Sequence, residues 1–79
     1  MALENLTSMD QLLVGQKAIV TALTSAGLER RRMIDLGFVS GTLVEVLHRS
    51  PAGDPVAYGF RGAVIALRRS DARQVLVEL

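Results

Sequence analysis

The chain has 79 residues, of which 49% are apolar and 4% aromatic, and it contains neither tryptophan nor cysteine. A chain of this length can bury one core, which here must be built mainly from aliphatic side chains. Without cysteine, disulfides, thiolate metal sites and cysteine nucleophiles are excluded. The formal net charge of +1 lacks the basic excess of a dedicated nucleic-acid-binding domain.

The sequence also argues against export and against a membrane span. Met1–Thr7 contains Glu4 and no basic residue, unlike the start of a secretory signal, so we expect a cytoplasmic location. The longest apolar run, Ala63–Leu67, is far shorter than the roughly 20 residues of a membrane-spanning helix.

The first elements expected along the chain are a helical turn over Ser8–Val14 and a strand over Lys17–Leu23. Ser8 and Gln11 have the spacing of a capping box, in which each side chain bonds a free backbone N–H. Both faces of the strand are largely apolar, so the pattern leaves its inward face open.

A helix is expected next, over Leu28–Leu36, where Leu28, Arg32 and Leu36 recur at helical spacing. Gly37 ends this helix in the left-handed conformation, and Phe38 is expected to fold back onto Met33 or Ile34.

The second half of the chain predicts strands separated by turns. Val44 and Val46 alternate with their neighbours, and the sequence SPAGDP is dense in turn-forming residues. The expected elements are a strand over Thr42–His48, a loop over Ser50–Pro55, a hairpin of Val56–Phe60 and Ala63–Arg68 turning at Arg61 and Gly62, a helical turn over Ser70–Arg73, and a strand over Val75–Glu78.

This arrangement predicts a single domain over residues 1–79 that is mainly β. About five short strands in so short a chain favour a small SH3-like barrel, with one helix inserted after the first strand and a helical turn before the last. Closure would also protect the apolar strand edges.

Several phrases of the sequence closely resemble the FeoA family: RMIDLGF-x-x-GT, P-x-GDP, RG-x-x-IALRR and A-x-x-V-x-V. The resemblance covers almost the whole chain. It implies an SH3-like accessory domain of ferrous iron transport and iron homeostasis that works in the cytoplasm beside the membrane transporter FeoB, which bears a GTP-binding domain. It implies no catalysis and no cofactor.

We expect the partner to dock on the helix and on the SPAGDP loop, because proline-stiffened loops lose little entropy on binding. Exposed apolar side chains mark such surfaces, and Leu43 is a further candidate if it is exposed. The predicted partner-binding residues are Leu28, Arg30, Arg31, Met33, Pro51, Asp54 and Pro55.

The arginine run Arg30–Arg32 has other interpretations. Consecutive helical side chains point about 100° apart, so the three cannot serve one contact. Arg31 or Arg32 could pair with Asp35, as side chains four or three residues apart do. One arginine could instead act as an arginine finger at the partner's GTP site.

Other functions stay open at this point. His48 is the only histidine, and a first-row metal needs several convergent ligands, so we expect a surface histidine and no metal site. A module related to the C-terminal domain of DtxR-type iron-dependent repressors, sensing metal or mediating oligomerisation, is the alternative function. A homo-oligomer is compatible with either function, whereas a nucleic-acid-binding barrel or an enzyme is not supported.

Overall fold

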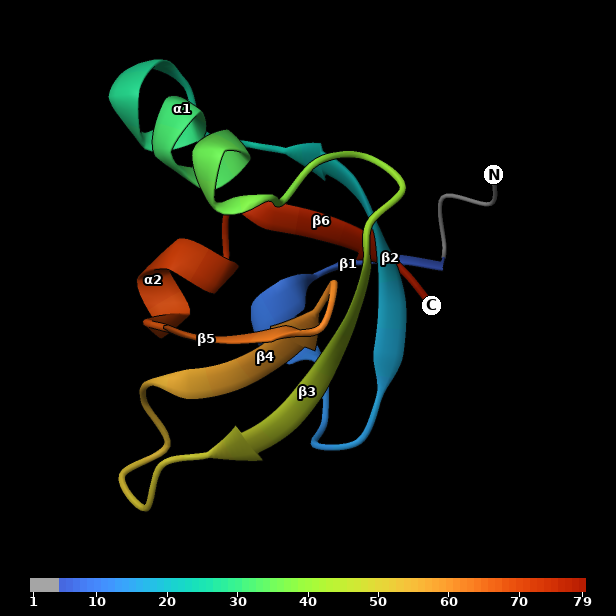
Figure 1. Cartoon of the computed structure of the whole chain (residues 1–79), viewed down its shortest axis with the longest axis vertical. Coiled ribbons are helices and arrows are strands. Elements are labelled where there is room, and N and C mark those ends of the chain that lie inside the picture. The colour runs from blue at the N-terminus through green and yellow to red at the C-terminus, as the bar shows by residue number, and fades with distance from the viewer. Residues whose placement is uncertain (1–4) are drawn as a thin grey trace.

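The computed structural model describes residues 5–79, which form an antiparallel sheet curved around an aliphatic core (Figure 1). The strands are β1 (Leu6–Ser8), β2 (Lys17–Leu23), β3 (Leu43–Arg49), β4 (Val56–Phe60), β5 (Ala63–Leu67) and β6 (Val75–Glu78). They are joined in the order β1-β6-β2-β3-β4-β5, so β1 and β5 each have one neighbour. The other elements are the 3-10 turn η2 (Met9–Gln11) and the helices α1 (Gly27–Leu36) and α2 (Arg69–Ala72).

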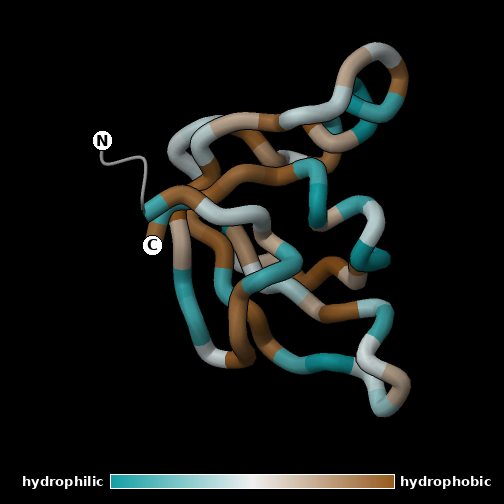
Figure 2. The backbone as a smooth tube through the Cα atoms, turned by 180° about the vertical axis from the view of Figure 1, so that it is seen from behind, coloured by the Kyte–Doolittle hydropathy of each residue, from teal (hydrophilic) through white to brown (hydrophobic). Residues whose placement is uncertain are grey.

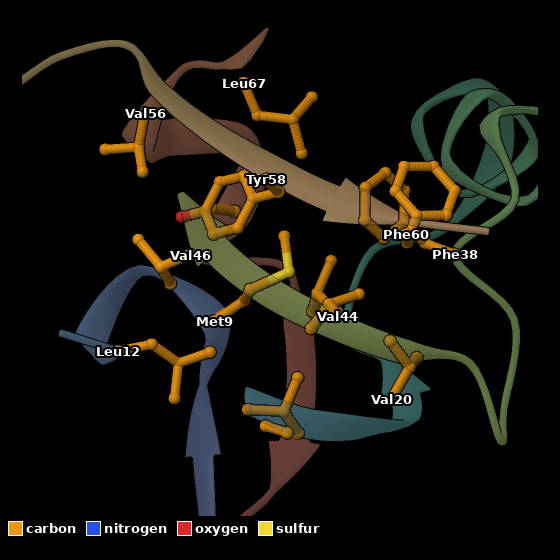
Figure 3. Close-up of a cluster of buried hydrophobic side chains, with 14 of the residues drawn as sticks. Met9, Leu12, Val20, Phe38, Val44, Val46, Val56, Tyr58, Phe60 and Leu67 are labelled. Atoms are coloured by element: carbon orange, nitrogen blue, oxygen red, sulfur yellow. The ribbon is translucent and has the colours of Figure 1, made fainter. Parts of the chain in front are cut away.

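The core fills the space inside the curved sheet, as the cluster in Figure 3 shows. Val44 and Val46 of β3 are both buried, which confirms that they share a face, and the strand lies one residue further along than the expected Thr42–His48. In β2, Ala18 and Val20 point inward, but the register shifts between Val20 and Ala22. The strict alternation therefore ends there. The remaining buried apolar residues include Met9, Leu12, Met33, Phe38, Val56, Tyr58, Phe60, Leu67, Ala72, Val75 and Val77.

The N-terminal segment differs from the prediction. The sheet has a sixth strand, β1, which pairs with β6, so α1 follows the second strand of the chain. The helical turn is shorter than predicted, and Ser8 makes no capping bond. The Ser8 hydroxyl instead donates to the Asp10 carboxylate, and Gln11 Nε2 donates to the same group at 3.3 Å. The charged acceptor thus takes both side chains that the capping box assigned to the backbone.

The end of α1 follows the prediction. Gly37 has φ +111°, its N–H donates to the Ile34 carbonyl at 2.9 Å, and the Phe38 N–H donates to the Met33 carbonyl at 3.1 Å. These are the two bonds of a Schellman cap. The rings of Phe38 and Phe60 lie 4.7 Å apart, and a Cβ at Gly37 would come within 2.9 Å of Phe60. Glycine is therefore required both by the backbone and by the packing.

Candidate partner-binding surface

Helix α1 projects from the barrel (Figure 1) and buries one side chain in the core. Met33 is its only buried residue, whereas Leu28 is 88% exposed and Ile34 and Leu36 are also exposed. Leu28, Arg32 and Leu36, which recur at helical spacing, are all exposed. Because burial of Met33 removes it from any contact surface, it drops out of the predicted partner-binding residues.

The three arginines of α1 point in three directions, as predicted. Arg30 Nη1 donates to the Leu23 carbonyl at 3.5 Å. Arg31 Nε pairs with the Asp35 carboxylate at 3.3 Å, and Arg32 pairs with the carboxylate of Asp71 in α2. The expected pairing of Arg31 with Asp35 is confirmed, while Arg32 holds α1 against the C-terminal part of the chain.

A groove of about 210 Å³ lies between α1 and β2. Its lining includes Leu23, Arg30, Ile34, Phe38 and Val39. The groove therefore combines aliphatic walls with one guanidinium. This is a suitable surface for an apolar side chain flanked by an acidic one.

The SPAGDP loop is held by bonds of its own. The Ser50 N–H donates to the Pro55 carbonyl at 3.1 Å, and the Gly53 N–H donates to the Ser50 carbonyl at 2.8 Å. Asp54 Oδ1 accepts the Arg69 N–H at 2.9 Å, so it satisfies a backbone donor in the first turn of α2. Pro51 is exposed, whereas Asp54 and Pro55 are half-buried.

The two predicted parts of the docking face are separated in space. In Figures 1 and 2, α1 lies at the top of the molecule and the β3–β4 loop at the bottom. The structure thus places Leu28, Arg30 and Arg31 on one projecting helix, with Arg30 turned toward β2, and it places Pro51, Asp54 and Pro55 at the other end of the barrel.

Another surface was not predicted as a site. A groove of about 560 Å³ lies on the outside of the sheet, with a lining that includes Lys17, Leu43, Glu45, Gly59 and Arg61. It lies along the stretch of sheet where Gly59 pairs with Glu45 and Val64. The exposed Leu43 was singled out in the sequence, but the groove was not, since it depends on the register of three strands.

A polar group at one end of the barrel was also missed. The Asp10 carboxylate is buried, with Arg73 Nε 4.0 Å away, and Arg49 donates to the Leu12 carbonyl at 2.7 Å. Burial raises the pKa of the nearby Tyr58 hydroxyl to about 12, helped by the Asp10 and Asp54 carboxylates and opposed by two arginines. These groups hold η2, β3 and α2 together and offer no free nucleophile.

The structure adds two observations on metals and membranes. Within residues 5–79, no cluster of three or more His, Asp or Glu side chains is placed to hold a metal ion, and His48 lies exposed on β3. Neither α1 nor α2, the α-helices of the described part, is long and apolar enough to cross a membrane.

Comparison with known proteins identifies relatives along nearly the whole chain. The model of the FeoA domain family matches residues 7–79, which confirms the resemblance seen in the sequence motifs. Over 71 residues, 90% of this chain, it is 34% identical to the Fe(2+) transport protein A/Fe(2+) transporter FeoB fusion protein of Porphyromonas gingivalis. The chain spans only 8% of the length of that relative.

Solved structures agree with the fold. The FeoA protein of Chlorobium tepidum is 33% identical, with a TM-score of 0.83 covering 92% of this chain and 70% of that chain. The FeoA-like protein of Clostridium acetobutylicum is 30% identical, with a TM-score of 0.89 covering 100% and 90%. FeoA domains are non-enzymatic SH3-like accessory domains, which confirms the predicted fold and the prediction that the chain is not an enzyme.

The alternative function has support from the fold alone. A manganese-dependent transcriptional repressor in complex with manganese is 18% identical, with a TM-score of 0.83, and this chain covers 37% of it. At that identity the likeness extends to architecture, and architecture does not carry function.

Proposed function

Because the chain belongs to the FeoA domain family, we propose that it is an accessory component of ferrous iron transport that binds an FeoB-type transporter on the cytoplasmic side. The observation that carries the proposal is the projecting α1, which exposes Leu28, Arg30 and Arg31 and contributes little to the core. A helix that contributes little to the core can bind a partner without disturbing the barrel.

The fusion relative supports the choice of partner. In the Porphyromonas gingivalis protein, a segment similar to this chain and an FeoB transporter belong to one polypeptide. Linking two modules raises their effective concentration to the millimolar range, so even a weak contact between them would be occupied. Where the two modules are separate chains, the contact surface itself must supply more of the binding affinity.

The physical form of the contact follows from α1. Leu28 is 88% exposed, and burying a leucine side chain contributes about 1.5–3 kcal/mol. Arg31, three residues further along the helix, is its neighbour on the helix surface, and it is exposed. We therefore assign the contact to an apolar pocket rimmed by acidic groups on the transporter, with Leu28 as the anchor.

The test is a titration of the isotope-labelled chain with the cytoplasmic part of its cognate FeoB, with and without GTP. Backbone resonances of α1 should shift, and Leu28→Asp should weaken binding by about tenfold or more. Leu13→Asp is the matched control, because Leu13 is a 66% exposed leucine outside α1. Shifts confined to Pro51–Pro55 would move the contact to the loop, and no shift in either state would refute the proposal.

A further inference from the structure

Strand β5 is an unguarded edge of the sheet. It pairs only with β4, through a two-residue turn in which Arg61 and Gly62 have φ +52° and +75°. In such a hairpin the residues flanking the turn exchange both backbone bonds, and every second pair along the ladder does the same. Ala63, Ile65 and Leu67 therefore bond to β4, whereas the N–H and C=O groups of Val64 and Ala66 face away from it.

These outward groups have no partner within residues 5–79. Outside the ladder with β4, no backbone hydrogen bond to Val64 or Ala66 is found within residues 5–79, and both residues are exposed, Val64 to 68%. Natural edge strands are usually protected by an inward charge, a proline or a bulge. The β5 sequence AVIAL has no charge or proline, and its pairing with β4 has no register shift.

The charged residues of the hairpin and its far end are all arginines, while the Asp54 carboxylate accepts the Arg69 N–H at 2.9 Å. Between Val56 and Arg69 the only charged residues are Arg61 at the tip and Arg68 and Arg69 at the far end. Arg68 and Arg69 form no ion pair within the described part of the chain. Arg61 occupies a turn position where Asn or Gly is usual, and its guanidinium donates to Thr42 Oγ1 at 3.3 Å beside the groove over Gly59.

This charge pattern selects the occupant. Two copies of the chain could pair through β5 only in an antiparallel sense about a two-fold axis. With Val64 opposite Ala66, the Arg61 end of each copy would then lie against the Arg68 and Arg69 end of the other. Like charges placed opposite each other in a ladder are destabilising, so a second copy is disfavoured and a strand with acidic ends is favoured.

We propose that the β5 edge binds an extended segment of another protein as an added strand, with aliphatic residues at its centre and a carboxylate at each end. The backbone of Val64 and Ala66 supplies the ladder, and Arg61, Arg68 and Arg69 pair with the carboxylates. From Ala63 to Arg68 the extended chain spans about 17 Å, and Arg61 lies beyond it in the turn, so the surface suits a segment of about seven residues. This surface is distinct from α1, so the inference goes beyond the proposed function.

The probe is the labelled peptide acetyl-Glu-Val-Thr-Val-Thr-Val-Glu-amide, titrated into the isotope-labelled chain. The amide resonances of Val64 and Ala66 should shift, and their hydrogen exchange should slow. Val64→Pro removes the outward N–H without breaking the bonds to β4, as proline at a strand edge allows, and should weaken binding at least fivefold. Val64→Thr keeps the N–H and the β-branched shape, so it should bind like the parent chain.

Two further experiments change the peptide, so their results do not depend on how variants of the chain fold. N-methylating alternate peptide amides should abolish binding in one phase of the alternation and leave it intact in the other. Replacing both glutamates of the peptide by lysine should weaken binding about tenfold at low salt, and less at 1 M salt, where charges are screened. Arg61→Gly, which suits the turn, and Arg68→Glu should each reduce the preference for the acidic peptide.

The contrary outcomes are equally specific. Equal binding of the lysine peptide, insensitivity to the phase of N-methylation, or resonance shifts away from β5 would overturn the proposal. So would a concentration-dependent dimer of the chain alone that Val64→Pro abolishes, since the edge would then be closed by a second copy. All of these measurements use a synthetic peptide or the chain alone, so they leave the FeoB proposal untouched.

Discussion

The β4–β5 hairpin contributes most of its β4 side chains to the core, whereas helix α1 contributes one. In β4 every residue except Gly59 is buried, and Leu67 of β5 is buried with them. In the ten residues of α1 only Met33 is buried. Burial of apolar surface supplies most of the stability of a small domain. The hairpin therefore helps define the barrel, whereas α1 can present side chains to a partner at little cost to folding.

The sharpest way to test this difference lies within α1 itself. Met33→Ala should lower the free energy of unfolding by about 2–4 kcal/mol, because it empties a fully buried site. Leu28→Ala should change it by less than about 0.5 kcal/mol, because Leu28 is 88% exposed. Urea denaturation of both variants measures the change in the free energy of unfolding. Similar decreases in the two variants would mean that α1 is packed along its whole length.

The cap of α1 provides a second matched pair. Gly37→Ala should cost about 2–3 kcal/mol, since it combines φ +111° with a Cβ only 2.9 Å from the Phe60 ring. Gly27→Ala, at φ +63° with no atom within 4 Å, should cost only about 1 kcal/mol. Thermal or urea unfolding gives the two values. Equal losses of stability would show that the cost comes from the backbone conformation alone, and that the Phe60 ring moves aside for the new Cβ.

The pH dependence of the stability tests the contribution of Tyr58, which lies in β4 of the hairpin. Burial raises the pKa of Tyr58 from 10.0 to about 12, so the folded state holds this proton more tightly than the unfolded chain does. The contribution to stability is complete below pH 10 and is lost as pH rises through 12. Stability should fall by about 2 kcal/mol across that range.

The control for this effect is Tyr58→Phe, which keeps the ring and removes the titrating hydroxyl. Unfolding measured in urea at several pH values should show a shallower decline above pH 10 in the variant than in the parent chain. Identical slopes would assign the decline to groups other than Tyr58.

The longer strands were predictable because each is a run of apolar and β-branched residues bounded by turn-forming residues. The bounds expected for Lys17–Leu23, Val56–Phe60 and Val75–Glu78 are those of the structure. Strand β1 was missed because three residues cannot show an alternation, and it is a strand only through its pairing with β6. The capping box failed because Asp10, which lies between its two members, competes for their side chains.

The surface was less predictable than the fold. Residue types identified Leu28 and the splitting of the arginine run, both of which depend only on helical geometry. They could not show that α1 and the SPAGDP loop lie at opposite ends (Figure 1), or that Met33 is the anchor. Those facts depend on contacts between distant segments, as does the exposed backbone of β5, which requires the strand order and the register.

A smaller effect is expected at the loop. Asp54→Ala removes the carboxylate that accepts the Arg69 N–H at 2.9 Å, and the loss of such a cap costs about 1 kcal/mol. Asp54→Asn keeps an acceptor oxygen and should recover most of that loss. If neither variant changes the urea midpoint, α2 does not depend on this bond, and Asp54 becomes available again as a partner contact.

The smallest effect is expected for the arginine pair of α1. Arg31 and Asp35 are separated by 3.3 Å, but their side chains are 76% and 64% exposed, so Arg31→Ala should cost less than about 0.5 kcal/mol in unfolding experiments. Arg32→Ala should cost more, because Asp71, its partner in α2, is only 21% exposed. If Arg31→Ala nevertheless weakens binding to the transporter while stability is unchanged, the exposed pair serves recognition. A loss of stability as large as that of Arg32→Ala would instead make Arg31 part of what holds the helix to the barrel.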